Sequence, residues 1–210
     1  MKILAHRGYW NKQIEKNSPV ALRTALEKGY GFESDVRDYA GKMVISHNIA
    51  NASSQDAEEL FQWLDEFHDQ YCFAINIKAD GLKDILQSYL EKYHISNYFL
   101  FDMSVPQMIE FREEGLKFYT RQSEVEEPVL YKDAEGVWID GFWSTEWITE
   151  ELLGRHLDNG KKICLVSPDL HGNMEYRKFW EKIRSYKLDF NAISLCTDYP
   201  DEAKEFFDEK

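Results

Sequence analysis

The chain has 210 residues and a formal net charge of −13. This length suits one domain, residues 1–210, with a single sizeable core. So negative a chain repels nucleic acid and anionic membranes at long range, so neither is expected as a partner. No segment approaches a membrane span, and the first apolar stretch is too short for a signal sequence, so we expect a cytoplasmic protein. Three cysteines without metal-type spacing predict neither disulfides nor a zinc site.

Strand-like apolar runs alternate with helical patterns along the chain. In the first half, strands are expected at residues 2–6, 32–39, 43–47, 72–78 and 98–102. Helices are expected at 18–28, 55–67, 81–93 and 105–114. Ser18 is available as the N-cap of the first helix, with Pro19 in its first turn. The turn Ala40-Gly41-Lys42 makes the second and third strands a hairpin.

The second half repeats this alternation and indicates the fold class. Strands are expected at 117–121, 137–143, 162–166 and 191–196, and helices at 145–157, 175–186 and 200–207. The charge-rich stretch 124–136 predicts a surface loop, so the fifth crossover is weak. Without the hairpin return, about eight strand and helix units result, the pattern of a (β/α)8 TIM barrel. An open doubly wound sheet is less favoured, because polar residues recur at most strand ends and not at one switch point.

Polar side chains follow several strands at the ends where such a barrel carries its chemistry. His6 and Arg7 follow the first strand, and His47 closes the hairpin. Glu33 and Asp35 are two apart on a strand, so they project to the same face and suit a hard cation, Mg²⁺ or Ca²⁺. Two imidazoles can act as acid and base, and a guanidinium matches phosphate oxygens. Together these residues predict a site for cleaving a phosphate diester, although alternating carboxylates alone usually mark a solvated face.

Other polar residues are weaker candidates. Asn76 and Lys78 repeat the two-residue spacing on the next strand and would join the same site. Gly8 would let its turn approach a ligand closely. His171 follows a strand and is a further candidate, whereas structural roles are expected for the histidines in or beside helices, which are His68, His94 and His156. Asp102 and Arg121 also occupy strand ends.

Four segments, AHRG, EKNSPVAL, FESDV and VISHN, resemble the glycerophosphodiester phosphodiesterase family, in the wider group that includes phosphatidylinositol-specific phospholipase C and sphingomyelinase D. The segment SLCTDYPDEA resembles the family's Thr-Asp-x-Pro ending. The resemblance implies a (β/α)8 barrel in which His6 and His47 form the acid-base pair and Arg7 contacts phosphate. It also implies that Glu33 and Asp35 bind one divalent cation.

The chain departs from the family pattern at the third metal ligand. Lys78 matches a lysine that follows this ligand, but the ligand itself, usually glutamate, is Asn76 here. An amide oxygen still coordinates Mg²⁺ or Ca²⁺, but the site loses a negative charge. Asp102 is a further candidate for completing it. Lys16 and Asn48 also replace acidic residues of the family motifs.

The leading hypothesis is a metal-dependent phosphodiesterase that hydrolyses a small soluble glycerophosphodiester to an alcohol and glycerol phosphate. Attack by a hydroxyl of the substrate would instead give a cyclic phosphate, as in a lyase. The alternatives are a non-catalytic barrel that binds a phosphorylated ligand and an interaction protein with surface aromatics such as Trp143. Trp143 could also stack on a choline-like head group. The sequence leaves the head group, the ion and the oligomeric state open.

Overall fold

The computed structural model describes residues 1–12 and 15–208. The chain divides into two compact units, one formed by Met1–Ala5 with Tyr119–Lys210 and the other by His6–Phe118. All of the site residues that the sequence predicts, from His6 to Lys78, belong to the second of these units.

The sheet of the unit 6–118 is built on β2 (Gly31–Tyr39). On one side β2 pairs in parallel with β5 (Phe73–Ile77), which pairs in parallel with β6 (Tyr98–Phe101). On the other side it forms an antiparallel hairpin with β3 (Lys42–Ile45), which pairs with the short β4 (Gln55–Asp56). The register places Asp35 opposite Asn76 on the neighbouring strand.

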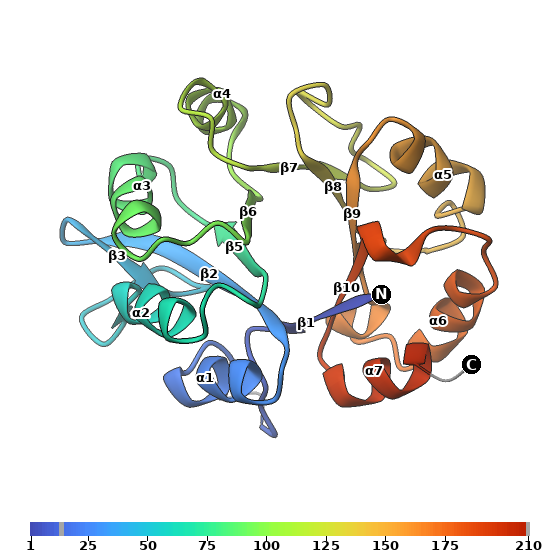
Figure 1. The fold of residues 1–210 in the computed structure, drawn as a ribbon, viewed down its shortest axis with the longest axis horizontal. Coiled ribbons are helices and arrows are strands. Elements are labelled where there is room, and N and C mark those ends of the chain that lie inside the picture. The colour runs from blue at the N-terminus through green and yellow to red at the C-terminus, as the bar shows by residue number, and fades with distance from the viewer. Residues whose placement is uncertain (13–14, 209–210) are drawn as a thin grey trace. The chain divides into compact units, whose positions relative to one another are not determined.

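The described residues of this unit form the α-helices α1 (Pro19–Glu27), α2 (Glu58–Glu66), α3 (Lys83–Lys92) and α4 (Val105–Glu113) beside the sheet. The expected N-cap is confirmed, since Ser18 Oγ accepts a hydrogen bond from Ala21 N at 3.1 Å. Figure 1 shows α1, α2 and α3 beside β2, β3 and β5, and α2 contacts both of the other helices. Phe73 of β5 packs against Phe32 and Phe61, with ring centroids 4.9 and 5.7 Å apart. This apolar packing occupies one face of β2 and leaves the other face to Glu33 and Asp35.

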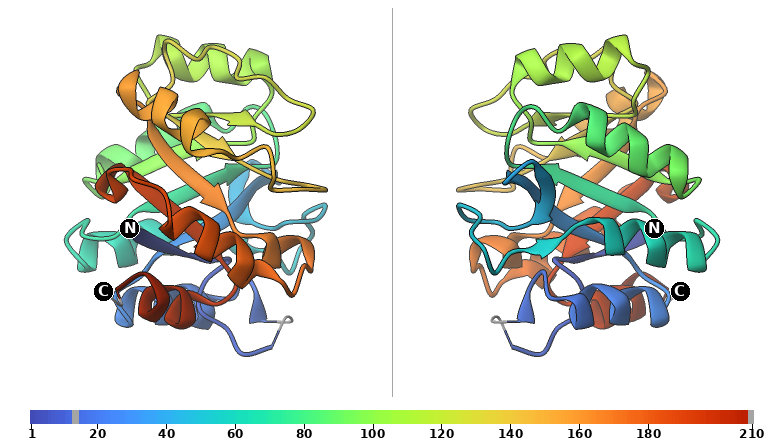
Figure 2. Two further views of the ribbon diagram at one scale, coloured as in Figure 1. Left: turned by 90° about the vertical axis from the view of Figure 1, so that its right-hand side faces the viewer. Right: turned by 90° about the vertical axis from the view of Figure 1, so that its left-hand side faces the viewer.

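The unit 1–5 with 119–210 is a run of parallel strands. In order across the sheet these are β1 (Lys2–His6), β10 (Ile193–Thr197), β9 (Lys162–Val166), β8 (Gly136–Ile139) and β7 (Tyr119–Gln122). Its helices are α5 (Glu150–Asp158), α6 (Tyr176–Arg184) and α7 (Pro200–Asp208), with the 3₁₀ turns Pro168–His171 and Phe190–Ala192. Figure 2 shows β9 and β10 side by side, with α6 and α7 nearby.

The expected alternation of strands and helices is confirmed, with local corrections. His47 lies two residues beyond the end of β3 and does not close it, and residues 55–56 form β4 before α2 begins. β8 ends at Ile139, four residues early, because the N–H groups of residues 142–144 donate to the Glu124 carboxylate and not to a neighbouring strand. α5 begins at Glu150 and not at residue 145, because Thr149 caps it. Residues 123–135 form turns and contain no α-helix, as expected from the weak fifth crossover.

The cysteines form no disulfide in the described part of the chain. None of the helices described for residues 1–12 and 15–208 combines the length and the apolar character that crossing a bilayer requires.

Candidate active site

The turn between β1 and α1 carries the first two candidate residues, His6 and Arg7. Arg7 and Gly8 both have a positive φ, +56° and +90°. A Cβ at Gly8 would lie 2.6 Å from the carbonyl carbon of Ala21, and Tyr9 N donates to Ala21 O at 2.7 Å. The lack of a side chain at Gly8 therefore lets this turn pack closely against α1. This packing fixes the backbone from which the imidazole and the guanidinium project.

Glu33 and Asp35 lie buried on the face of β2 opposite its apolar packing, with exposed fractions of 1% and 0%. Glu33 is contacted from two strands. Asn76 Nδ2 donates to its Oε1 at 3.1 Å, Arg7 N donates to its Oε2 at 3.3 Å, and His6 Nε2 lies 3.9 Å from the same Oε2. Arg7 also contacts Asp35, which confirms the expectation that both carboxylates share one face.

Asp35 lies among four donors. Asn17 Nδ2 donates to its Oδ2 at 2.8 Å, and Arg7 Nε lies 2.9 Å from that oxygen in an ion pair without hydrogen-bond geometry. His47 Nδ1 lies 3.1 Å from Oδ1, and Lys78 Nζ lies 3.7 Å from it. The Asp35 carboxylate therefore gathers the basic residues of the site around one point.

Asn17 is a site residue that the sequence analysis treated only as part of a motif. It has a φ of +61°, its Oδ1 accepts from Ser34 Oγ at 2.9 Å, and its N–H donates to Arg7 O at 2.9 Å. It thus ties the β1–α1 loop to β2 and orients the Asp35 carboxylate. The sequence offered two signals for this residue. It lies in the segment EKNSPVAL, and asparagine tolerates a left-handed backbone better than most residues.

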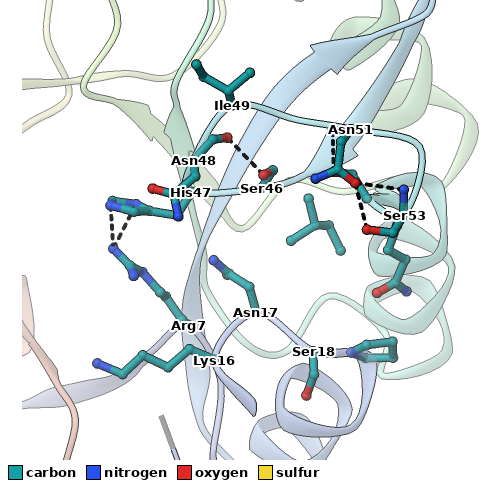
Figure 3. Close-up of a pocket in the computed structure, with 14 residues that line it drawn as sticks. Arg7, Lys16, Asn17, Ser18, Ser46, His47, Asn48, Ile49, Asn51 and Ser53 are labelled. Atoms are coloured by element: carbon teal, nitrogen blue, oxygen red, sulfur yellow. Dashed lines mark hydrogen bonds between the residues drawn. The ribbon is translucent and has the colours of Figure 1, made fainter. Parts of the chain in front are cut away.

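Arg7 and His47 meet at the wall of a pocket (Figure 3). The Arg7 Nη2 atom lies 2.8 Å from Nδ1 and 3.4 Å from Nε2 of His47. The imidazole Nδ1 either donates to Asp35 or accepts from Arg7, because one nitrogen cannot do both at once. When it donates to Asp35, the Nε2 atom is left as a base, and the His47 side chain is 43% exposed and accessible to a ligand.

The remaining candidates have other partners. Lys78 Nζ contacts Asp102 at 2.5 Å, so this ammonium lies between two carboxylates. In the other unit, Arg121 pairs with Glu126 and His171 Nε2 contacts Asp140 Oδ1 at 2.6 Å. His156 is buried, as expected for a structural histidine.

The two buried carboxylates differ in protonation. Burial raises the pKa of Glu33 well above its usual range, and the charge of Asp35 raises it further, which Arg7, Asn76 and Lys78 only partly offset. Burial also opposes the charge of Asp35, but the hydrogen bond from His47 and the charges of Arg7 and Lys78 outweigh it and lower the pKa of Asp35. Asp35 is therefore ionised, while at Glu33 the nearby positive charges do not outweigh burial and the charge of Asp35.

The donor set fits a hard divalent cation next to Glu33. The Asn76 Oδ1 atom is buried and has no hydrogen-bond partner, while its Nδ2 is held by Glu33. A bound cation would satisfy this oxygen and favour the charged form of Glu33. Asp35 would have to release one of its present donors to join them. No group of three or more His, Cys, Asp or Glu residues suited to a metal ion occurs in the described part of the chain, so water or substrate would complete the coordination.

A scan of the sequence against protein-family models gives no match. A search of curated proteins gives none either.

Solved structures do match, over nearly the whole chain. The crystal structure of a glycerophosphodiester phosphodiesterase from Agrobacterium tumefaciens aligns with a TM-score of 0.66 and 15% identity, over 98% of both chains. A glycerophosphoryl diester phosphodiesterase from Parabacteroides distasonis aligns with a TM-score of 0.72 and 15% identity, over 99% of this chain and 86% of that one.

A third similar structure is a Ca²⁺-dependent phosphatidylinositol-specific phospholipase C from Streptomyces antibioticus. It aligns with a TM-score of 0.59 and 8% identity, over 98% of this chain and 95% of that one. At these identities the likeness establishes the fold. The chain therefore has the (β/α)8 fold that the glycerophosphodiester phosphodiesterases share with phosphatidylinositol-specific phospholipase C.

Proposed function

We propose that this protein is a phosphodiesterase that hydrolyses a small glycerophosphodiester to an alcohol and glycerol phosphate. The observation that carries the proposal is the meeting of Arg7 and His47 around the buried Asp35, at the wall of a pocket. A guanidinium, an imidazole and a carboxylate that orients them are the groups that cleavage of a phosphate diester requires. The fold shared with phosphodiesterases is consistent with this chemistry.

In the proposed reaction His6 and His47 are the acid-base pair. One imidazole takes a proton from the attacking water as the new phosphorus–oxygen bond forms. The other gives a proton to the leaving alkoxide as the old bond breaks. Arg7 donates to the non-bridging phosphoryl oxygens, whose negative charge grows in the transition state. Asp35 orients His47 and Arg7, with Asn17 holding the carboxylate in place.

We further propose that Glu33 and Asn76 hold one Mg²⁺ or Ca²⁺, with Asp35 as a third ligand. The unpartnered Asn76 Oδ1 and the raised pKa of Glu33 support this site. A cation bound there supplies positive charge to the phosphoryl oxygens. Lys78, whose Nζ lies 3.7 Å from Asp35 Oδ1, would add a second positive charge for the phosphate while keeping its contact with Asp102. A cytoplasmic location stays a prediction of the sequence.

The test is hydrolysis of bis-p-nitrophenyl phosphate and of a panel of glycerophosphodiesters, with Mg²⁺, with Ca²⁺ and with a chelator. We expect turnover that the chelator abolishes, and a loss of about 10²–10⁴-fold for His6→Asn and for His47→Asn. The matched control is His94→Asn, which changes an exposed histidine outside the site and should keep full activity. Absence of turnover with every diester and ion would instead favour a phosphoryl-binding protein.

A further inference from the structure

The pocket beside Arg7 and His47 extends well beyond the groups that the proposed reaction uses. Its volume is about 670 Å³, and it continues from these two residues along the β3–β4 connection to the start of α1. This volume is typical of sites that bind a small organic molecule. Since a phosphoryl group occupies only the end at Arg7, the rest of the pocket has room for one of the two alcohols of a diester.

The lining of this pocket selects a chemical class. Figure 3 shows Lys16 beside Arg7 at one end and Asn51 with Ser53 at the other. The described residues that line it include no carboxylate and no Phe, Tyr or Trp ring, which are the groups that most often bind a quaternary ammonium or a primary amine. Only three aliphatic side chains contribute, which is too few to cover an acyl chain. Amide and hydroxyl groups dominate, and these match an alcohol that carries many hydroxyl groups.

Several polar groups of the lining lack partners that a hydroxylated ligand would supply. The Nδ2 atom of Asn51 and the side-chain amide of Asn48 make no hydrogen bond to the described residues. Gln55 Nε2 donates to Glu59 Oε2 at 2.8 Å, while the buried Gln55 Oε1 has no partner. A hydroxyl both donates and accepts, so vicinal hydroxyls satisfy such alternating donors and acceptors.

The end of the pocket away from the phosphate is held in a fixed shape. Asn51 Oδ1 accepts from Ser53 N at 2.9 Å and from Ser53 Oγ at 2.6 Å, and Ser54 Oγ accepts from Asn51 N at 3.0 Å. These bonds orient the Asn51 amide so that its Nδ2 donor is available. A binding group that is fixed in advance loses less entropy when a ligand arrives.

Taking the proposed function as its basis, we propose that this pocket binds the head group of the substrate, and that this head group is a polyhydroxylated ring, a cyclitol or a hexose. A three-carbon glyceryl group would leave most of the volume to water, whereas a six-membered ring places hydroxyls toward Asn48, Asn51 and Gln55 together. Choline and ethanolamine diesters should be poor substrates, because the lining offers their cationic head groups no carboxylate and no Phe, Tyr or Trp ring.

The experiment compares kcat/KM for glycerophosphoinositol, glycerophosphocholine and glycerophosphoethanolamine, with bis-p-nitrophenyl phosphate as a diester without a head group. We expect the inositol diester to exceed both others by about tenfold or more, equivalent to 1.4 kcal/mol. Asn51→Asp keeps the acceptor that holds Ser53 but replaces the Nδ2 donor by an oxygen and adds a negative charge. It should lower the inositol-to-choline ratio about tenfold, and Gln55→Met should lower it in the same direction.

The matched control is Asn173→Asp, whose side chain also accepts from a backbone N–H two residues ahead but does not line the pocket. It should leave the ratio unchanged. Cleavage of bis-p-nitrophenyl phosphate without preference for the inositol diester, or an unchanged ratio in both pocket variants, overturns the head-group assignment and leaves the phosphodiesterase proposal standing. Absence of cleavage for all four diesters overturns both.

Discussion

At the scale of single residues, Asn76 separates this site from one built of carboxylates alone. Its amide holds Glu33 through Nδ2 and leaves a buried oxygen without a partner. In a site of this kind the number of charged ligands controls affinity for a divalent cation. An amide in place of a carboxylate would therefore weaken the proposed cation site, and it also avoids a second buried negative charge next to Glu33.

Replacing Asn76 by aspartate should reverse both effects. We expect Asn76→Asp to bind Ca²⁺ or Mg²⁺ about tenfold more tightly or better by titration calorimetry, since one added negative charge faces the ion. In the presence of a chelator the same variant should unfold at a lower temperature, because two carboxylates then repel each other. Asn173→Asp is the control for an added exposed charge. Unchanged or weaker affinity for the ion would mean that Asn76 is not a ligand.

At the scale of elements, the β1–α1 turn depends on the absence of a side chain at Gly8. Two costs act there, a left-handed backbone and a lack of space against Ala21. Gly41, in the β2–β3 turn, has a φ of +78° with nothing within 4 Å of an added Cβ, so it isolates the backbone cost alone.

Comparing the two glycines tests the close approach of this turn to α1. Gly41→Ala should lower the free energy of unfolding by about 1 kcal/mol, the cost of a left-handed alanine. Gly8→Ala should lower it by about 2 kcal/mol or more and also reduce activity, because the turn that carries His6 and Arg7 must shift. Urea unfolding of both variants measures the difference, and equal losses would contradict the packing of the turn on Ala21.

Helix α5 carries a buried histidine that makes folding pH-dependent. His156 Nε2 lies 2.8 Å from Gln122 Oε1, and its Nδ1 lies 2.9 Å from the Tyr131 hydroxyl. Because an amide oxygen only accepts, Nε2 carries the proton and Nδ1 accepts from the tyrosine, which describes a neutral ring. Burial and, to a lesser extent, the charge of Arg155 together lower the pKa of His156 to about 4.

The stability of the protein should therefore fall as the pH drops from about 6.5, the ordinary histidine value, to about 4. In that range His156 is protonated in the unfolded chain but stays neutral in the folded chain, so a falling pH favours the unfolded state. Between pH 7 and pH 5 the expected loss is about 2 kcal/mol. Urea unfolding at pH 7 and pH 5 should show a smaller difference for His156→Gln than for the natural chain. The exposed His94→Gln should keep the full difference, and an unchanged slope in His156→Gln would refute a neutral buried ring.

At the scale of the whole molecule, the net charge of −13 opposes the approach of an anionic diester, although Arg7 and Lys16 attract it at short range. Salt screens the long-range repulsion first, because the Debye length falls from about 30 Å at 0.01 M to about 8 Å at 0.15 M. A contact inside the pocket is screened much less.

We therefore expect kcat/KM for bis-p-nitrophenyl phosphate to rise about twofold between these two salt concentrations. Any turnover of glycerophosphocholine, which carries no net charge, should change less and serves as the control. Initial rates at fixed cation concentration measure the effect. A steep fall of kcat/KM with salt would mean that the local cations dominate the encounter.

The pattern of the sequence determined most of the secondary structure and named most of the candidate site residues. Alternating apolar runs fixed the strand and helix order, because each element needs one apolar face, and Ser18 and Pro19 fixed the start of α1. The two-residue spacing of Glu33 and Asp35 placed both carboxylates on one face, because side chains alternate along a strand.

Only the tertiary structure decided how these groups pair. Asn17 and Lys78 are 61 positions apart in the chain, yet both contact the Asp35 carboxylate, and no local pattern encodes such a contact. The polar run at residues 48–55 was visible in the sequence, but a short polar stretch shows neither which groups are satisfied nor what space lies beside them. Folding decides both, since hydrogen-bond partners and cavities depend on residues brought together from distant parts of the chain.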